Sequence, residues 1–534
     1  MAQLRPLLAF IVLFVVGCGQ QHTTESGLVY CSEGDPITFN PQQAISSTTL
    51  DATSKQLYNR LIHFDPKSGT YVPELATSWQ ISPDGLTYLF TLREHVPFHQ
   101  TEYFQPSRFF TASDVVFSFQ RWLDRSHPYY QIGGGRYPFF QNIGLDAIGL
   151  QVEQISKQQV RIQLKQPRPS LLQELATDFA VILSEEYGLA MLGRGQPQFL
   201  DERPIGTGPY QLHEYQRNQF IRYNRHEQYW GTPAKLTKLV FDITPSASAR
   251  VIKLIGNDCD IATLPQLSEL KTIQSYPDLA LEQAPSLNTA YWAFNTDKAP
   301  FNHPSVRLAL SYAIDKKRLL ESVYHNTAVL AVGMLPPSSW AYPQPESAYY
   351  AYNPGLAQKL LAEADVGPIH INILTIPMAR PYNPDPMYMA RLIQQDLALI
   401  GVSSSIITYD LSRFLQLLNR AEYDSVLIGW NADTLDPDNF FTPLLSCNAL
   451  VSGSNHARWC LPEFDELINQ AKNDAIPQQR QILYKELEQM LRLHHPLVPL
   501  AHANRIIGRQ REWQGQVLHT NGGIDFTQID RGAL

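Results

Sequence analysis

The sequence has no long run of lysine or arginine, and its 534 residues carry a formal net charge of −8. This shortage of positive charge argues against binding to phosphate backbones, so we expect no nucleic-acid partner. Charged residues make up only 17% of the chain and hydrophobic residues 44%, as in ordinary globular proteins. Because the chain is too long for one hydrophobic core, at least two lobes are expected.

Signatures of catalysis are also missing. The chain contains no G-x-S-x-G, no G-x-x-x-x-G-K-[ST] and no G-x-G-x-x-G motif. His-Glu pairs at 213–214 and 226–227 begin like the helix of a zinc protease, but neither has a histidine at the required spacing. The segment 436–438 starts like a calcium loop and lacks its glycine and final glutamate. We therefore predict a protein that is not an enzyme and that uses no metal and no cofactor.

Cysteine is scarce, and the first of five, Cys18, ends a segment typical of a bacterial lipoprotein signal. Residues 7–16 form an apolar run that is too short to span a bilayer comfortably. A glycine stands directly before the cysteine, where cleavage needs a small residue. We predict a signal peptide at 1–17 and a lipidated N-terminus and tether at 18–26. An uncleaved anchor or a plain signal peptide is the alternative.

The other four cysteines are Cys31, Cys259, Cys447 and Cys460. An even number in an exported chain predicts two disulfides, for which three connectivities are possible. The short separation of Cys447 and Cys460 favours their pairing and leaves the other two for each other. A zinc site made by all four is the alternative, and the absence of a C-x-x-C motif argues against it.

Two patterns divide the rest of the chain. Up to residue 284, strand-like segments such as 88–92 and 239–243 are mixed with a helix at 114–123. From residue 285, helical stripes such as 390–400 alternate with strands such as 369–373. The second pattern predicts an α/β lobe, in which helices cover a sheet.

These patterns predict two lobes. We place lobe I, with an extra subdomain, at 27–284 and lobe II at 285–502. Residues 503–534 are too few to fold alone, so they are expected to complete lobe I. The chain would then cross between the lobes twice, near 285 and near 500, and these crossings would form a hinge.

The segment Ser425 to Trp430 reads as a short buried strand, and a loop with three carboxylates follows it. In an open α/β sheet, the tip of a strand presents polar groups to a crevice. Asp433 is therefore predicted to hold the cation of a ligand. The alternative is an Asx-turn or a helix N-cap, which many loop aspartates form.

Six motifs spread over the chain resemble one known family. They are Tyr30-Cys31-Ser32-Glu33-Gly34 with Phe39-Asn40-Pro41, Pro73 to Trp79, Pro204 to Tyr210, Tyr229-Trp230-Gly231, Ala293 to Thr296, and Gly429-Trp430 with Asp436 to Phe441. Together they resemble ABC-transporter solute-binding proteins of the peptide/nickel class (family 5), most closely the dipeptide-binding and Sap-type peptide-transport branches. The similarity runs from about Leu28 to about Asp530.

This resemblance implies an α/β fold: a two-lobed periplasmic binding protein (type II, cluster C) with a hinge and a ligand cleft between the lobes. It implies the pairs Cys31–Cys259 and Cys447–Cys460 and a periplasmic, lipid-anchored monomer of a Gram-negative bacterium. Its partners would be short peptides and the permease and ATPase subunits in the inner membrane.

The resemblance also assigns ligand-binding residues. In the dipeptide branch an aspartate holds the peptide ammonium and an arginine holds the carboxylate, and the matching residues are Asp433 and Arg380. Tyr382 and Trp430 stand in the same motifs and are expected to contact the ligand. An arginine offers a carboxylate a rigid bidentate fork. The alternative for Arg380 is a surface ion pair.

The predicted function is capture of di- or tripeptides for an ABC importer. The alternative within binding proteins is Sap-type binding of cationic antimicrobial peptides or of haem. A secreted hydrolase or a folding factor would belong to another class, and the missing nucleophile and metal motifs argue against the hydrolase.

Overall fold

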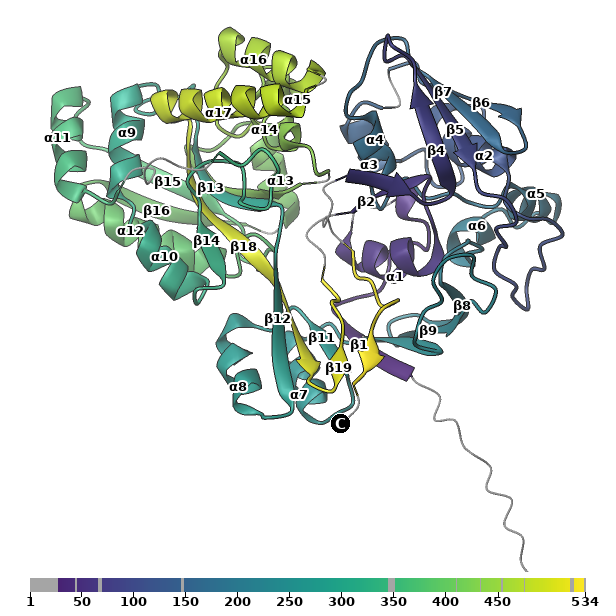
Figure 1. Ribbon diagram of the computed structural model, residues 1–534. Coiled ribbons are helices and arrows are strands. Elements are labelled where there is room, and N and C mark those ends of the chain that lie inside the picture. Colours follow the sequence, from purple (N-terminus) through teal and green to yellow (C-terminus); the bar gives the residue numbers. More distant parts are fainter. Residues whose placement is uncertain are drawn as a thin grey trace, which may run out of the picture.

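The computed structural model describes residues 27–43, 46–65, 70–145, 148–343, 351–409, 411–432, 434–452, 455–474, 476–518 and 523–532. They form two lobes joined by long strands (Figure 1). The first lobe is the part built from strands β1 to β12 and the C-terminal residues. The second lobe is the part built from β13 to β17 with helices α9 to α17, and it lies on the left in Figure 1.

One long sheet runs through both lobes in the order β16-β15-β17-β13-β18-β11-β1-β10-β9-β8, and β12 and β14 also pair with β18. Its strands are β1 Gly27–Ser32, β8 Tyr210–Gln216, β9 Phe220–Arg225, β10 Lys238–Ile243, β11 Ile261–Thr263, β12 Leu279–Pro285, β13 Asn288–Phe294, β14 Ala328–Leu330, β15 His370–Thr375, β16 Ser403–Thr408, β17 Ser425–Asn431 and β18 Leu497–Gln510. β1 is parallel to β10 and β11, and β15 is parallel to β16 and β17. Such parallel pairs require crossover connections.

Strand β18 belongs to both lobes. Its first half pairs with β13 and β14 of the second lobe, with Ala501 opposite Ala290 and Leu330. Its second half pairs with β11 and β12 of the first lobe, with Asn504 opposite Pro285. The chain therefore passes between the lobes in the β12–β13 connection and again inside β18, and these two passages lie side by side.

The first lobe contains a second sheet, β4-β5-β7-β6, and two sheets of two strands each, β2-β3 and β19-β20. Their bounds are β2 Ile62–Asp65, β3 Thr70–Pro73, β4 Ala76–Ile81, β5 Thr87–Leu92, β6 Gln151–Ser156, β7 Gln159–Gln163, β19 Trp513–Gln514 and β20 Asp530–Arg531. The helices are η1 Pro41–Gln43, α1 Ser47–Leu57, α2 Ala112–Leu123, α3 Pro138–Asn142, α4 Leu171–Leu175, α5 Glu185–Gly193, α6 Phe199–Glu202, α7 Ala247–Ile255, η2 Leu267–Glu269 and α8 Leu270–Ser275. Near the C-terminus, the buried ring of Phe526 packs against Tyr30 and Phe241. The C-terminal residues around Phe526 thus pack on this lobe.

In the second lobe, helices cover both faces of the sheet. They are α9 Pro304–Ala313, α10 Lys316–Val323, α11 Pro354–Ala364, α12 Pro386–Leu399, α13 Leu411–Asn419, η3 Pro437–Phe440, α14 Thr442–Leu445, α15 Ala449–Ser452, α16 Pro462–Asn473 and α17 Pro477–His494. Trp292 and Phe294 of β13 face a core with α9 and α12, whereas Tyr291 and Ala293 face a core with α16 and α17. Alternate strand residues thus serve opposite cores. The predicted stripe at 390–400 is buried, and the α/β prediction is confirmed.

Glu488, in α17, is a buried carboxylic acid that holds the loop after β14. Its carboxylate accepts hydrogen bonds from the backbone N–H groups of Met334 at 2.7 Å and Leu335 at 2.9 Å. Burial raises the pKa of Glu488 from 4.5 to about 7. Because the folded-state pKa lies above the unfolded value, the folded protein favours the protonated acid. The stability linked to this group is fully present below pH 4.5 and is lost as the pH rises to about 7.

We expect Glu488→Gln to remove this pH dependence. Between pH 4.5 and 7 the wild type should lose about 3 kcal/mol of unfolding free energy relative to the variant, since one pKa unit corresponds to about 1.4 kcal/mol. Urea titrations at several pH values across this range measure the difference. Glu486→Gln, on the exposed face of the same helix, is the control. The prediction would be wrong if the difference in unfolding free energy between Glu488→Gln and the wild type stayed constant across this pH range.

Candidate functional site

Arg380 lies in a tight turn between β15 and α12. Its backbone N–H donates to the carbonyl of Asn383 at 2.8 Å, and its own carbonyl accepts from the Asn383 N–H at 2.9 Å. The Tyr324 hydroxyl donates to the carbonyl of Tyr382 at 2.8 Å. The buried Asn383 side chain accepts from the N–H of Asp385, which is the N-cap of α12. A turn held at these points presents the Arg380 side chain from a fixed backbone.

The ring of Tyr382 lies against the end of β17. A Cβ on Gly429 would come within 2.3 Å of Tyr382 Cδ2 and 2.5 Å of the backbone oxygen of Thr289. Only glycine, which lacks that atom, allows the ring to approach so closely. Burial raises the pKa of the Tyr382 phenol, and the charge of Arg380 opposes this rise. The structure therefore brings Arg380 and Tyr382 together beside the strand that carries Trp430.

Trp430 is fixed by the short helix that follows its strand. Its half-buried indole donates an N–H to Asn439 Oδ1 of η3 at 2.8 Å. Asp433 lies outside the described residues, and its contact with a ligand stays a prediction. On one side of it, the Ala432 N–H donates to the carbonyl of Leu287 at 2.8 Å, and on the other side Thr434 is buried. Both flanks of Asp433 are thus anchored in the second lobe.

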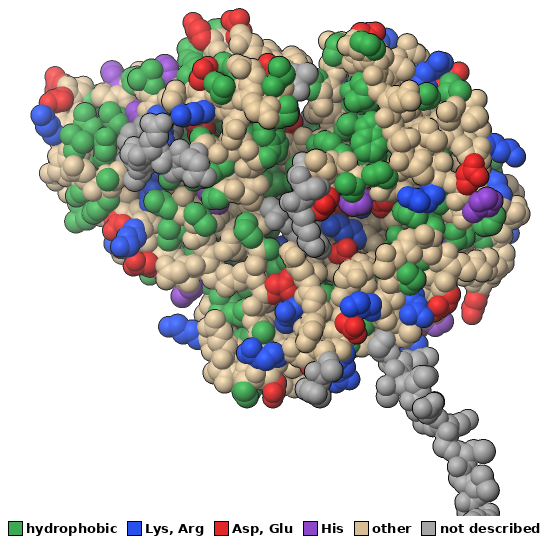
Figure 2. All heavy atoms as spheres, viewed as in Figure 1, with side chains coloured by type: hydrophobic (Ala, Val, Ile, Leu, Met, Phe, Trp, Pro, Cys, Tyr) green, Lys and Arg blue, Asp and Glu red, His purple; other side chains and the backbone are tan. Residues whose placement is uncertain are grey.

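A cavity of about 860 Å³ lies between the two lobes, and Arg380 is in its wall. In the view of Figure 2 the surface is hollowed where the lobes meet. The second lobe contributes Ser322, Val323, Tyr324, His325, Thr327, Ala379, Arg380, Pro381, Pro384, Asp385 and Tyr388. The first lobe contributes Glu33, Pro245, Ala247, Arg250 and the residues 264–268, and β18 contributes Ala503, Asn504 and Ile506. The cavity has the size that small-molecule sites usually have.

Opposite charges face this cavity from opposite lobes. On the first-lobe side, Glu33 accepts a hydrogen bond from the Ser47 hydroxyl at 3.1 Å through Oε1. Its Oε2 is buried and has no hydrogen-bond partner among the described residues. On the second-lobe side, no described carboxylate lies within ion-pair distance of the Arg380 guanidinium. An acid and a base are thus both available to a ligand that enters between the lobes.

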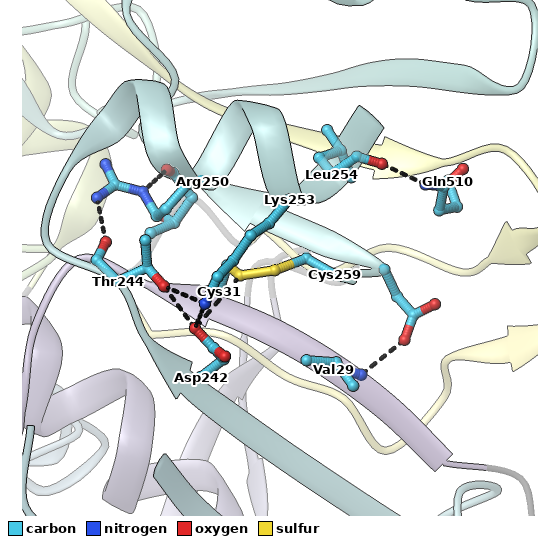
Figure 3. The surroundings of a disulfide bond; sticks show 11 residues. Val29, Cys31, Asp242, Thr244, Arg250, Lys253, Leu254, Cys259 and Gln510 are labelled. Atoms are coloured by element: carbon cyan, nitrogen blue, oxygen red, sulfur yellow. Dashed lines mark hydrogen bonds and ion pairs between the residues drawn. A yellow bond between two sulfur atoms is a disulfide. The ribbon is translucent and has the colours of Figure 1, made fainter. Parts of the chain in front are cut away.

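The first-lobe wall is cross-linked, as Figure 3 shows. The disulfide Cys31–Cys259, with a Cα–Cα distance of 5.9 Å, joins β1 to the segment between α7 and β11. The Arg250 guanidinium donates to four backbone carbonyls, those of Thr244, Pro245, Thr263 and Leu264. Its donors are therefore used within the wall, and Arg250 acts by fixing the two segments on either side of it.

The second disulfide, Cys447–Cys460, lies in the second lobe next to α16, with a Cα–Cα distance of 4.8 Å. Both predicted pairs are thus present. Cys18 and the rest of the predicted signal and tether lie outside the described residues. Among the residues that are described, no helix has the length and apolar character to span a membrane. Within the same ranges, no group of three or more histidine, cysteine, aspartate or glutamate side chains is arranged to hold a metal ion.

The sequence profile of the bacterial extracellular solute-binding proteins, family 5 (middle region), matches residues 70–450, which is more than half of the chain. The chain belongs to this family. The match includes Arg380, β17 and the loop after it, and it excludes β1 and β18.

Relatives of this family 5 protein match it over nearly their whole length. The dipeptide-binding protein of Escherichia coli (strain K12) is 38% identical over 98% of this chain and 97% of its own. The peptide transport periplasmic protein SapA of Salmonella typhimurium is 38% identical over 95% of this chain and 92% of its own. The crystal structure of a dipeptide-binding protein from Pseudoalteromonas sp. SM9913 with Met-Leu superposes with a TM-score of 0.82, at 41% identity, covering 95% of this chain and 100% of that one.

Sequence reasoning on this family 5 protein missed the first-lobe side of the cavity. Glu33 stood in a motif but was given no role, and Arg250 was not singled out. One signal was present: Glu33 directly follows β1, which is parallel to both of its neighbours. Residues at the carboxyl ends of parallel strands are the ones that an open α/β sheet presents to a ligand.

Proposed function

We propose that this solute-binding protein captures di- and tripeptides in the periplasm and delivers them to the permease of an ABC importer. One observation carries the proposal. The cavity between the lobes has in its wall an arginine that lies on a braced turn and has no described carboxylate partner. An uncompensated guanidinium in such a place favours a ligand that brings its own anion.

The peptide carboxylate is the anion that this site fits. A guanidinium forms two parallel hydrogen bonds to a carboxylate, and each charge-assisted bond contributes roughly 1.5–3 kcal/mol. We assign this role to Arg380 and assign the peptide ammonium to Asp433. Tyr382 and Trp430 are not among the residues that line the cavity, and their contact with the ligand is likewise a proposal. Holding a peptide at both ends sets its length and leaves its side chains to the remaining cavity, where water can fill the space around them.

Other parts of the proposal rest on the sequence. We propose lipid attachment at Cys18 after cleavage at 17, lobe boundaries at 284/285 and 502/503, and a monomer that binds without chemical change of its ligand. Two of the relatives are dipeptide-binding proteins, which supports the last point. The inner-membrane permease and ATPase would be the protein partners.

Blocking the ends of a dipeptide tests this proposal. We expect calorimetry to detect binding of unmodified di- and tripeptides, and we expect C-terminal amidation or N-terminal acetylation each to weaken it about 100-fold, because each removes one charge-assisted contact. Peptides of equal length with exchanged side chains are the control and should change affinity less. Equal affinity for free and blocked peptides would rule out the assignment of both ends.

One other candidate is Sap-type binding of a larger cationic peptide or of haem, which the likeness to the peptide transport protein SapA and to heme-binding protein A of Haemophilus influenzae supports. The acidic Glu33 in the cavity wall is compatible with a cationic ligand. A large peptide would not be held at both ends, so its affinity would survive loss of Arg380. Haem would give a Soret band on titration. Neither result is expected if short peptides are the ligand.

A further inference from the structure

The two lobes touch at a second place, away from the cavity, where α4 of the first lobe meets the loop before η3 of the second. Gln173, in α4, is only 5% exposed. With its amide oriented to match its partners, its oxygen accepts from the N–H of Leu435 at 3.0 Å and from the N–H of Asp436. Its amide nitrogen donates to Asp436 Oδ2 at 3.1 Å. One first-lobe side chain thus satisfies three polar groups of the second lobe.

Asp436 is itself locked inside the second lobe. Both of its carboxylate oxygens accept from Arg480 Nη2 at 2.7 Å, and Oδ1 also accepts from the Tyr484 hydroxyl at 3.2 Å. The same Oδ1 accepts from the Asp438 N–H at 2.9 Å, which caps η3. The carboxylate that Gln173 meets is therefore held in place by the core around α17.

This loop is continuous with the proposed ligand site. Asp436 is three residues after Asp433, and η3, which Asp436 caps, holds the indole of Trp430 through Asn439. Leu435, whose N–H is one of the Gln173 partners, packs on the same core as Trp430. The contact between Gln173 of α4 and this loop therefore constrains the chain directly before η3, next to the proposed ligand site.

We propose that Gln173 is a positioning residue that latches the lobes together and holds the 434–436 loop in the form that binds ligand. The inference rests on the proposed function for its ligand, but the contact itself does not depend on it. In the absence of Gln173 the N–H group of Leu435 loses its buried acceptor, whereas the N–H of Asp436 keeps the hydroxyl of Thr434 as an acceptor at 3.3 Å. The closed arrangement then loses three hydrogen bonds that the open arrangement replaces with water.

Gln173→Met tests the latch, because methionine keeps the length and volume of glutamine and removes its hydrogen bonds. We expect a dipeptide to dissociate roughly tenfold faster in stopped-flow measurements, with little change in the association rate, since contacts completed on closure act on dissociation. Gln173→Glu should have a larger effect, because it places a second carboxylate against Asp436. Gln154→Met, on the exposed β6 of the same lobe, is the matched control and should match the wild type.

Small-angle scattering without ligand separates this inference from the proposed function. A larger radius of gyration in Gln173→Glu than in wild type and in Gln154→Met supports the latch whether or not peptides bind. Equal radii, or equal dissociation rates in Gln173→Met and the control, overturn it. Absence of peptide binding to the wild type overturns the proposed function alone. Thermal unfolding of each variant shows that a change in shape is not a failure to fold.

Discussion

Replacing Arg380 by alanine should weaken the binding of a dipeptide about 100- to 1,000-fold while leaving the fold intact. Removal of one partner of a desolvated, hydrogen-bonded charge pair costs roughly 2–5 kcal/mol of binding free energy, and about 1.4 kcal/mol corresponds to a factor of ten. Stability should change little, because no described carboxylate depends on this guanidinium. Calorimetry at one salt concentration measures the affinity.

The control variants make this result specific to the peptide ends. Arg391→Ala, on the exposed face of α12, removes the same side chain outside the cavity and should bind as the wild type does. Arg380→Lys should recover only part of the affinity, because an ammonium lacks the bidentate fork. Amidating the peptide C-terminus should cause no further loss in Arg380→Ala, and acetylating its N-terminus should cause none in Asp433→Ala. If either blocked peptide bound its variant more weakly than the free peptide does, or if Arg380→Ala kept wild-type affinity, the assignment of the two peptide ends would be wrong.

Arg480→Met should lower the free energy of unfolding by about 3–5 kcal/mol, as expected when one partner of a buried ion pair is removed. Arg480 is 7% exposed and Asp436 is 5% exposed. The arginine also donates to the carbonyl of Ala471 at 2.7 Å. The substitution leaves the Asp436 carboxylate buried with the Tyr484 hydroxyl and without its cation.

Two comparisons isolate this effect. Arg222→Met breaks the exposed pair with Glu214 and should change stability by less than about 1 kcal/mol. Arg480→Met combined with Asp436→Asn should be more stable than the single variant, because no uncompensated charge is then buried. Urea unfolding measures all four proteins. If Arg222→Met and Arg480→Met lowered the free energy of unfolding equally, the buried Arg480–Asp436 pair would not be a source of stability.

Much of the fold was predictable because its signals are local. The stripe at 390–400 and the proline before it are enough to indicate α12, and alternation at 369–373 indicates β15. The site was less accessible to this reasoning. Asp433 was indicated by its place at the tip of a strand, but Arg380 came only from the resemblance to a family, because the turn that presents Arg380 depends on the distant hydroxyl of Tyr324.

Contacts between the lobes gave no sequence signal at all. Gln173 stands in a short helix with no unusual motif, and its partners come much later in the chain. The cavity wall around Arg250 likewise depends on four carbonyls that only the folded chain gathers. These side chains are recognisable only from their buried hydrogen-bond partners, which lie far apart in the sequence and meet only in the folded structure.

The long strand β18 determines which parts of the first lobe can fold while the chain is still being synthesised. The first lobe contains the N-terminal strand, yet β12 finds its partner, and β11 its second partner beside β1, only in residues 504–510. Phe526 completes the packing around Tyr30. A nascent chain that stops before these residues exposes two unpaired strand edges, which invite aggregation. The native pairing of β11 and β12 with β18 therefore forms only after residues 504–510 have been synthesised.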